Sequence, residues 1–318
     1  MEDMHPKSRI ERKKRKFRFG RFFLSILTLI IVGTLLYSIV QYKAGQKLAA
    51  RQSQDPIEFN GDSLDIKNPT IENILVLGSD TRGEEKSRTD TMMLVSWNKE
   101  TDEVKVISFM RDIYADIPGY KSTKLNTAYF LGGVQLVKDT VTSMFGIPIH
   151  HYALIDFESF ETLVDIVAPN GVEIDVEKDM SEKIGVTLKK GIHKLNGKEL
   201  LGYARFRADK EGDFGRVARQ QKVMEALKEE VFKPVNVVHY PKFAGALQGY
   251  VETDYSSAEE VKRVLSLAAS GGVEIDKLTI PVEHSYQFST YEGAGSVIEI
   301  DVEQNKKALS EFIGYSLR

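Results

Sequence analysis

Two neighbouring stretches decide the fold: residues 73–82 (Asn-Ile-Leu-Val-Leu-Gly-Ser-Asp-Thr-Arg) and residues 88–96 (Arg-Thr-Asp-Thr-Met-Met-Leu-Val-Ser). Residues 73–77 and 92–95 are short apolar runs, which is the pattern of buried strands. The loop between them carries two aspartates and two arginines beside the ends of both strands. Ligands usually bind in loops at the strand ends of an open α/β sheet, so this loop is the predicted centre of a binding site.

An uncharged run, residues 22–40, precedes these strands. As a helix it spans roughly 28 Å, close to the hydrocarbon thickness of a bilayer. A block of basic residues comes immediately before it, and Tyr37 and Tyr42 lie at its far end. The positive-inside rule therefore predicts a cytoplasmic N-terminus. A cleaved signal peptide would have a shorter apolar region and a nearby cleavage site. The only small-residue pair, Ala49-Ala50, is too distant, which favours an uncleaved single-pass (type II) anchor.

The charge of the 318-residue chain is unevenly distributed. Nine basic and three acidic residues fall within residues 1–21, which leaves 34 basic and 43 acidic residues in the remainder. An acidic body argues against nucleic acid as a partner, since nucleic-acid binding requires a basic face. The chain has no cysteine, which excludes disulfides and thiolate metal sites. The sequence thus predicts a basic cytoplasmic tail (1–21), a transmembrane helix (22–42), an extracytoplasmic stalk (43–70) and one extracytoplasmic folded domain (71–318).

Within the folded domain, predicted strands and helices alternate. Further strands are expected at residues 104–110, 151–155, 171–176 and 278–282. Helices are expected at residues 134–145, 157–167, 198–206, 213–231, 256–269 and 302–312, and a turn at residues 191–197. The helix beginning before Val134 is expected to break at Gly132-Gly133 and to stop at Gly146. Alternating strands and helices predict an α/β fold, with a sheet covered by helices on both faces.

Arginine placement gives the strongest indication of function. After residue 21 the chain has ten arginines and twenty-four lysines, and the lysines are scattered. Seven arginines fall in four short stretches, each at the end of a predicted element: Arg82 and Arg88, Arg111, Arg205 and Arg207, Arg216 and Arg219. If they converge, their planar guanidinium groups would suit phosphate oxygens. Alternatively, each arginine pairs with a local acid, such as Asp80, Asp112, Asp209 or Asp213.

The predicted helix at residues 213–231 supports convergence. Val223, Leu227 and Val231 lie on one apolar stripe, and the same stripe extended backwards reaches Gln220 and Arg216. A buried arginine needs an anionic partner, and the positive end of the helix dipole attracts the same anion. That partner could be a ligand, or a salt-bridge partner among the aspartates at positions 80, 90 and 112.

Asp80 and Asp90 have more than one candidate role. Two carboxylates beside a phosphate site are a usual arrangement for Mg²⁺, which also takes phosphate oxygens and water. Asp90 could instead accept a proton from an attacking hydroxyl group. Alternatively, Asp80 caps the turn and Asp90 pairs with Arg88 or Arg111. The six histidines lack zinc-site spacing, and neither a Gly-x-Ser-x-Gly motif nor a glycine-rich nucleotide loop is present.

Several ordered motifs between residues 71 and 232 resemble the LytR-CpsA-Psr family. They are the two opening stretches, Met110-Arg111-Asp112, Lys124-Leu-Asn126, Gly146-Ile-Pro148, Leu195-Asn-Gly-Lys, Tyr203-Ala-Arg205-Phe-Arg207 and residues 212–221 (Gly-Asp-Phe-Gly-Arg-Val-Ala-Arg-Gln-Gln). The single N-terminal anchor also agrees. One departure is Phe109-Met110 before Arg111, where members more often carry proline.

The resemblance implies a central mixed β-sheet flanked by helices and an extracytoplasmic phosphotransferase activity. Such enzymes move an anionic glycopolymer, typically wall teichoic acid, from a polyprenyl-pyrophosphate carrier to the 6-hydroxyl of muramic acid in peptidoglycan. By the same resemblance, the pyrophosphate would be held by Arg88, Arg111, Arg205, Arg207, Arg216 and Gln220, with Arg82 and Arg219 more peripheral. Asp80 and Asp90 would bind Mg²⁺, or Mn²⁺ in its place. Asp90, Arg88 and Arg111 are the expected catalytic residues.

The lipid carrier requires an apolar groove, and membrane lipid and a cell-wall synthesis complex are further expected partners. Residues that could line the groove are Phe130, Phe157, Phe160, Val223, Leu227 and Val231, although the sequence favours core packing for each of them. Two other function classes remain open. One is a polyprenyl-pyrophosphate pyrophosphatase that uses water as the acceptor. The other is a non-enzymatic membrane regulator, as the older naming of such proteins as transcriptional attenuators implies.

Overall fold

The computed structural model describes residues 19–49, 57–64, 68–80, 89–255, 274–315 and 317. The chain forms two compact units, Met1–Val40 and Gln41–Arg318. Helix α1 (Phe19–Ala49) begins in the first unit and ends in the second. Among the described residues it is the one helix long and apolar enough to cross a membrane, over Leu27–Ala49. It thus continues past residue 42, the predicted end of the transmembrane segment.

A mixed six-stranded sheet forms the centre of the second unit, in the order β10-β3-β2-β1-β6-β9. Its strands are β1 (Ile71–Ser79), β2 (Thr89–Asn98), β3 (Val104–Phe109), β6 (His151–Asp156), β9 (Val251–Thr253) and β10 (Ile275–Ile280). The pairs β1–β6 and β3–β10 are parallel, and the other neighbours are antiparallel. This confirms the mixed sheet, and it brings the ends of β1 and β2 together beside the predicted loop.

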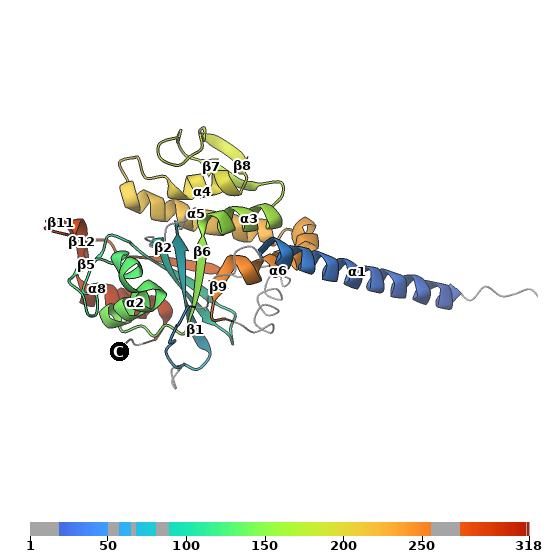
Figure 1. The fold of residues 1–318 in the computed structure, drawn as a ribbon, viewed down its shortest axis with the longest axis horizontal. Coiled ribbons are helices and arrows are strands. Elements are labelled where there is room, and N and C mark those ends of the chain that lie inside the picture. Colours follow the sequence, from blue (N-terminus) through green and yellow to red (C-terminus); the bar gives the residue numbers. More distant parts are fainter. Residues whose placement is uncertain are drawn as a thin grey trace, which may run out of the picture. The chain divides into compact units, whose positions relative to one another are not determined.

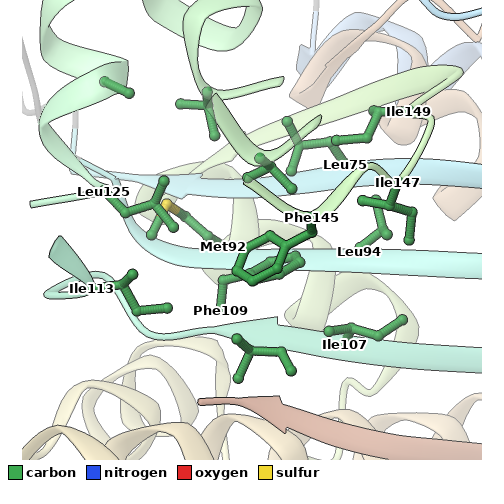
Figure 2. Packing of buried hydrophobic residues seen from close by; sticks show 14 of the residues in the cluster. Leu75, Met92, Leu94, Ile107, Phe109, Ile113, Leu125, Phe145, Ile147 and Ile149 are labelled. Carbon is green, nitrogen blue, oxygen red and sulfur yellow. The ribbon is translucent and has the colours of Figure 1, made fainter. Parts of the chain in front are cut away.

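One face of the sheet is covered by α2 (Thr127–Phe145) and α8 (Val302–Ile313) (Figure 1). Phe145 of α2 packs against Phe109 of β3, with ring centroids 5.4 Å apart, in the apolar core drawn in Figure 2. The helix breaks at Gly132-Gly133, where Gly133 has φ 63°, and ends at the left-handed Gly146, as predicted.

The other face carries α3 (Phe157–Val167), α4 (Gly197–Arg205) and α5 (Gly212–Val231), followed by η1 (Pro234–His239) and α6 (Tyr240–Tyr250) (Figure 1). Local sequence fixes where two of these helices begin. Asp156 caps α3 by accepting a hydrogen bond from the backbone N–H of Ser159, and Asn196 and Glu199 form a capping box at α4. Helices on both faces confirm the predicted fold class.

Small antiparallel hairpins complete the described structure: β4 (Tyr114–Ala115) with β5 (Thr123–Lys124), β7 (Val172–Val176) with β8 (Gly191–Leu195), and β11 (Tyr286–Tyr291) with β12 (Gly295–Ile300). The predicted turn at residues 191–197 is therefore wrong over residues 191–195, which form β8. That strand alternates exposed and half-buried residues before the buried Leu195, so it lacks the apolar run that would reveal it. The predicted helix at residues 256–269 lies outside the described residues.

Candidate functional site

A cavity of 490 Å³ lies between the sheet and helices α3, α4 and α5. At one end its wall is charged or polar, with Asp90, Arg205, Arg207, Arg216 and Gln220. The rest of the wall is largely apolar and includes Val76, Met93, Ile155, Phe157, Phe160, Leu201, Val223, Met224 and Leu227. The charged Glu182 and Lys183 line the cavity as well. The cavity therefore offers one compartment to an amphiphile with an anionic head and an apolar tail.

Helix α5 supplies both polar and apolar residues to the wall of the cavity. Arg216, Gln220, Val223 and Leu227 all line it, so most of the stripe inferred from helical spacing faces the cavity, while Val223 and Leu227 also pack in the adjacent apolar cluster. Gln220 is held in place because its side-chain amide donates to the hydroxyl of Thr91 on β2, at 3.0 Å. The N-terminal turns of α5 thus present polar groups, and the following turns present apolar ones.

Arg111, just after β3, connects the two acids of the site. Its Nη1 donates to Asp90 Oδ1 at 2.5 Å, and its Nε and Nη2 donate to the two oxygens of Asp213 at 3.0 and 3.3 Å. Burial alone would lower the pKa of Arg111, but the charges of Asp213 and Asp90 outweigh it and raise that pKa. Asp213 is a central site residue that sequence reasoning considered only as a local ion-pair partner. Its place three residues before Arg216, in the first turn of α5, is the signal that could have identified it.

Asp213 also contacts a second carboxylate, Asp112. Burial, and next a hydrogen bond with Asp112, raise the pKa of Asp213. Burial acts in the same direction on Asp112, but hydrogen bonds with Asp213 and Lys124 and the charge of Arg111 lower the pKa of Asp112 overall. The pair therefore holds a proton more readily on Asp213, while Asp112 stays ionised beside Lys124 Nζ, 2.8 Å away.

Arg216 is buried without full compensation. Its side chain is 3% exposed, and its Nη1 lies 3.4 Å from Asp213 Oδ1 and 3.8 Å from Asp90 Oδ1. Its Nε is buried and has no hydrogen-bond partner among the residues that the structure describes. Burial, and next the neighbouring charge of Arg111, lower the pKa of Arg216. A buried donor without an acceptor, at the charged end of a cavity, indicates a place for an anion.

Arg205 and Arg207 reach the same end of the cavity from the end of α4. Arg205 Nη2 donates to Asp80 Oδ2 at 3.4 Å, and its guanidinium lies 4.4 Å from the ring centroid of Phe157. Arg207 is exposed, and in the described part of the chain it makes no ion pair. Arg205 is thus oriented by its neighbours, whereas no ion pair within the described residues holds Arg207.

Arg219 does not line the cavity. Its Nε donates to Glu177 at 2.6 Å, its Nη1 donates to the carbonyl of Phe206 at 3.1 Å, and its Nη2 pairs with Asp209. These contacts satisfy the guanidinium away from the other arginines, as the local-pairing interpretation expects.

The remaining predicted residues divide between the cavity and other places. Phe157, Phe160, Val223 and Leu227 line the cavity, whereas Phe130 is 39% exposed and Val231 packs against the neighbouring apolar cluster. Arg82 and Arg88 lie outside the described residues.

The sequence prediction missed the wall residues contributed by strands, such as Ile155 and Met93. Their signal was the alternation of strand side chains: Met92 faces the core under α2, so Met93 faces the cavity.

The predicted ligands of Mg²⁺ are the carboxylates of Asp80 and Asp90. Among the described residues no group of three or more acidic or histidine side chains forms a metal cluster. Asp80 and Asp90 are both partly exposed, and both contacts of Asp90 use Oδ1. Asp90 Oδ2 is therefore available as a ligand. The donors fit an ion that takes one or two carboxylates and completes its shell with phosphate oxygens and water.

Comparison with known proteins gives a family and several relatives. The model of the LytR_cpsA_psr family matches residues 34–311. The regulatory protein MsrR of Staphylococcus aureus is 45% identical over 281 residues, covering 88% of this chain and 85% of MsrR. The polyisoprenyl-teichoic acid–peptidoglycan teichoic acid transferase TagU of Bacillus mycoides is 32% identical over 248 residues, covering 76% and 80%.

Solved structures share the fold. TagV of Bacillus subtilis superimposes with a TM-score of 0.64 at 29% identity, covering 78% of this chain and 98% of TagV. A structure of YwtF (TagT) with bound octaprenyl pyrophosphate has a TM-score of 0.58 at 24% identity, covering 81% and 99%.

Proposed function

Because this chain belongs to the LytR_cpsA_psr family, we propose that it is a membrane-anchored phosphotransferase of cell-wall assembly. Its donor is an anionic glycopolymer on a polyprenyl-pyrophosphate carrier, with wall teichoic acid as the proposed polymer. Its acceptor is the 6-hydroxyl of muramic acid in peptidoglycan. The name of TagU and the lipid bound to TagT support this assignment. The apolar helix α1 would hold the chain in the membrane as a single-pass anchor, with the folded domain outside.

The observation that carries the proposal is the two-part cavity with Arg216 at its charged end. A polyprenyl pyrophosphate has the same two parts, a doubly phosphorylated head and a long apolar tail. Its head would supply the acceptor that Arg216 Nε lacks. Its tail would lie along Phe160, Val223 and Leu227. Contact between the apolar tail and this apolar wall would be favourable because it removes both surfaces from water.

The proposed reaction balances as a phosphoryl transfer. The oxygen of the muramic acid hydroxyl bonds to the phosphorus next to the glycopolymer, the bond from that phosphorus to the bridging oxygen breaks, and polyprenyl monophosphate leaves. Positioning and charge stabilisation dominate such reactions, so no nucleophilic side chain is required. Arg111, Arg205, Arg207, Arg216 and Gln220 would hold the phosphate oxygens. The residues outside the described part of the chain, Arg82 and Arg88, remain proposed contributors.

Asp90 is proposed to receive the proton of the acceptor hydroxyl. Its Oδ1 is held by Arg111, which leaves Oδ2 for this purpose. Asp80 and Asp90 together would hold Mg²⁺, or Mn²⁺, and the metal would neutralise charge on the phosphates. Since a carboxylate oxygen on the metal cannot also take the proton, the two roles of Asp90 would fall to different oxygens or to different steps.

The test uses the full chain in lipid nanodiscs, supplied with a synthetic polyprenyl-pyrophosphate sugar and peptidoglycan oligomers. Mass spectrometry should find sugar phosphate joined to the oligomers and free polyprenyl monophosphate. Arg111→Ala and Asp90→Ala should each lower this transfer by about 10²-fold or more, with thermal unfolding still cooperative. Ile192→Ala, on the exposed face of β8, is the matched control.

Two outcomes would replace the proposal. Release of free sugar phosphate without any linked product would identify a pyrophosphatase. A folded, lipid-binding chain that leaves both substrates unchanged would support a regulatory role, which the name of MsrR suggests.

A further inference from the structure

An exposed apolar patch lies on η1, the short helix between α5 and α6. Val235, Val237 and Val238 are 67%, 51% and 52% exposed. Between them, Asn236 is buried, and its amide donates to the backbone carbonyl of Glu230 at 2.8 Å and to its Oε1 at 3.0 Å. The turn is therefore fixed by internal hydrogen bonds with its valines outward. Clustered exposed apolar side chains on an ordered element usually mark a contact surface.

The next helix, α6, packs directly against the last turns of α1. The hydroxyl of Tyr42 and the amide of Gln46 both donate to Gln248 Oε1, at 2.8 and 2.9 Å. The helices touch through glycines, since a Cβ on Gly245 would clash with the carbonyl of Tyr42, and one on Gly45 would clash with the carbonyl of Lys242. This contact lies entirely within residues 41–318.

The position of this contact along the chain places it at a bilayer surface, on the proposal that α1 is the membrane anchor. The uncharged run ends at Val40, and Gly45 follows about 8 Å further along the helix axis. Helix α6 is thus held within one or two helical turns of the point where α1 leaves the apolar phase. Because η1 leads straight into α6, its valines are held in the same neighbourhood.

The charges around the valines also fit a bilayer. Residues 232–251 contain no aspartate or glutamate. Lys233 pairs with Glu230 just before this segment, whereas Lys242 of α6 and Lys43 and Lys47 of the facing turns of α1 make no ion pair among the described residues. This lysine-bearing, acid-free region is unusual in a chain whose part after residue 21 has more acidic than basic residues. Apolar side chains beside lysines are the composition of elements that lie in the interface of an anionic membrane.

We propose that η1, together with the lysines of α6 and of the end of α1, is a membrane-contact surface whose valines enter the outer leaflet of an anionic bilayer. A consequence concerns the cavity, and it rests on the function proposed above. Phe243 of α6 packs in the same apolar clusters as Phe160 and Ile155, which line the cavity. One helix therefore separates the proposed bilayer contact from the apolar wall, so a lipid tail has a short path from the leaflet to the cavity.

The absence of cysteine from the chain allows a direct test. Val238→Cys in the full chain is labelled with an environment-sensitive fluorophore and placed in nanodiscs of phosphatidylglycerol and phosphatidylcholine that carry doxyl-quencher lipids. We expect a blue shift and strong quenching at position 238. The control is Ile192→Cys, on β8, where the native side chain is 69% exposed and where neither effect is expected. Equal quenching at the two positions would overturn the proposal, as would an absence of quenching at position 238.

The fluorescence measurement is independent of catalysis. Arg111→Ala combined with Val238→Cys should be quenched as strongly as Val238→Cys alone, even if the proposed transferase activity proves wrong. Lipid delivery is tested by changing all three valines to serine. This change should slow turnover of a long-chain donor by about tenfold, because η1 would no longer hold the entrance of the cavity close to donors in the bilayer. A short-chain, water-soluble donor should react at the unaltered rate. Loss with both donors, or with neither, would reject delivery through η1.

Discussion

Arg216 and Arg219 lie one helical turn apart on α5 and are equally buried, at 3% and 2% exposure, yet their surroundings differ. Arg219 donates to Glu177, to Asp209 and to a backbone carbonyl. Within the described part of the chain, Arg216 keeps a buried Nε without an acceptor and makes longer contacts to Asp213 and Asp90. The first region is a closed network of ion pairs. The second has hydrogen-bonding capacity left over, at the end of a cavity.

The comparison teaches that burial alone does not identify a functional charge. The pKa values of the two guanidinium groups shift in opposite directions. Burial lowers both, but hydrogen bonds with Glu177 and Asp209 raise the pKa of Arg219 overall. For Arg216, burial and the charge of Arg111 prevail, and its pKa is lowered. A buried cation that the folded chain does not fully compensate needs an anionic partner from outside the chain. In this site that partner would be the ligand.

The largest expected effect comes from exchanging each of these arginines for methionine, which keeps an unbranched side chain and removes the charge. Arg216→Met should reduce transfer by about 10²-fold or more, because on the proposed function it removes a guanidinium that would contact the phosphates. Its free energy of unfolding should stay within about 1 kcal/mol of the parent, or rise, since replacing a poorly compensated buried charge is often neutral or stabilising. The readouts are the transfer assay and denaturant unfolding.

Arg219→Met should give the reverse pattern. Removing Arg219 from the buried network leaves Glu177 without its arginine and Asp209 with Lys178 alone, so we expect a loss of about 3 kcal/mol of stability. Transfer measured well below the unfolding temperature should be largely retained. If Arg216→Met unfolded the domain and Arg219→Met abolished transfer in a stable protein, the roles assigned to the two regions would be exchanged.

Much of the fold could be predicted because local periodicity encodes it. Helix α5 spans Gly212–Val231, against a prediction of 213–231, and the break at Gly132-Gly133 follows from the positive φ that Gly133 adopts. The hairpin of β11 and β12 was not foreseen. Phe288 of that hairpin is 69% exposed, and so is Ile192 of the mispredicted β8. Strands that bury little apolar surface lack the apolar alternation from which a strand is predicted.

The site was predictable to the extent that its residues share one element. The helical stripe placed Arg216, Gln220 and Val223 on the cavity side without any coordinates. Helical spacing alone could not show that Arg219 is satisfied, because its partner Glu177 is 42 residues away in sequence and meets it only through tertiary packing. The alternatives left open for each arginine could therefore be decided only by the hydrogen bonds of the folded chain.

A smaller difference between the two regions should appear in the pH dependence of stability. Hydrogen bonds and the charge of Arg219 outweigh burial and lower the pKa of Glu177 below its usual 4.5. The stability that Glu177 adds to the folded state is therefore fully present above pH 4.5. It is lost as the pH falls through the pKa that Glu177 has in the folded state. Asp213 has the opposite sign: its pKa is raised, so protonating it on acidification favours the folded state.

Glu177→Gln should accordingly flatten the acid side of the stability curve below about pH 5, by less than about 1 kcal/mol because Glu177 is partly exposed and screened. Asp213→Asn should make that side steeper, since it removes the group that gains a proton on folding. Chemical unfolding at a series of pH values measures both slopes. Slopes that change in the same direction for the two variants would contradict the assignment.

The smallest expected effect concerns Arg207, which is exposed, against Arg205, which is oriented by Asp80 and Phe157. Arg207→Ala should leave stability within about 0.5 kcal/mol of the parent, because the side chain makes no ion pair among the described residues. It should weaken binding of a polyprenyl pyrophosphate by about tenfold at low salt, and by less at high salt, because an exposed charge acts through screened long-range attraction. Titration of the lipid at two ionic strengths measures this, with Arg205→Ala beside it. A loss at Arg207 that did not change with salt would mean that the bound lipid buries this guanidinium, so that the charged end of the cavity closes around its ligand.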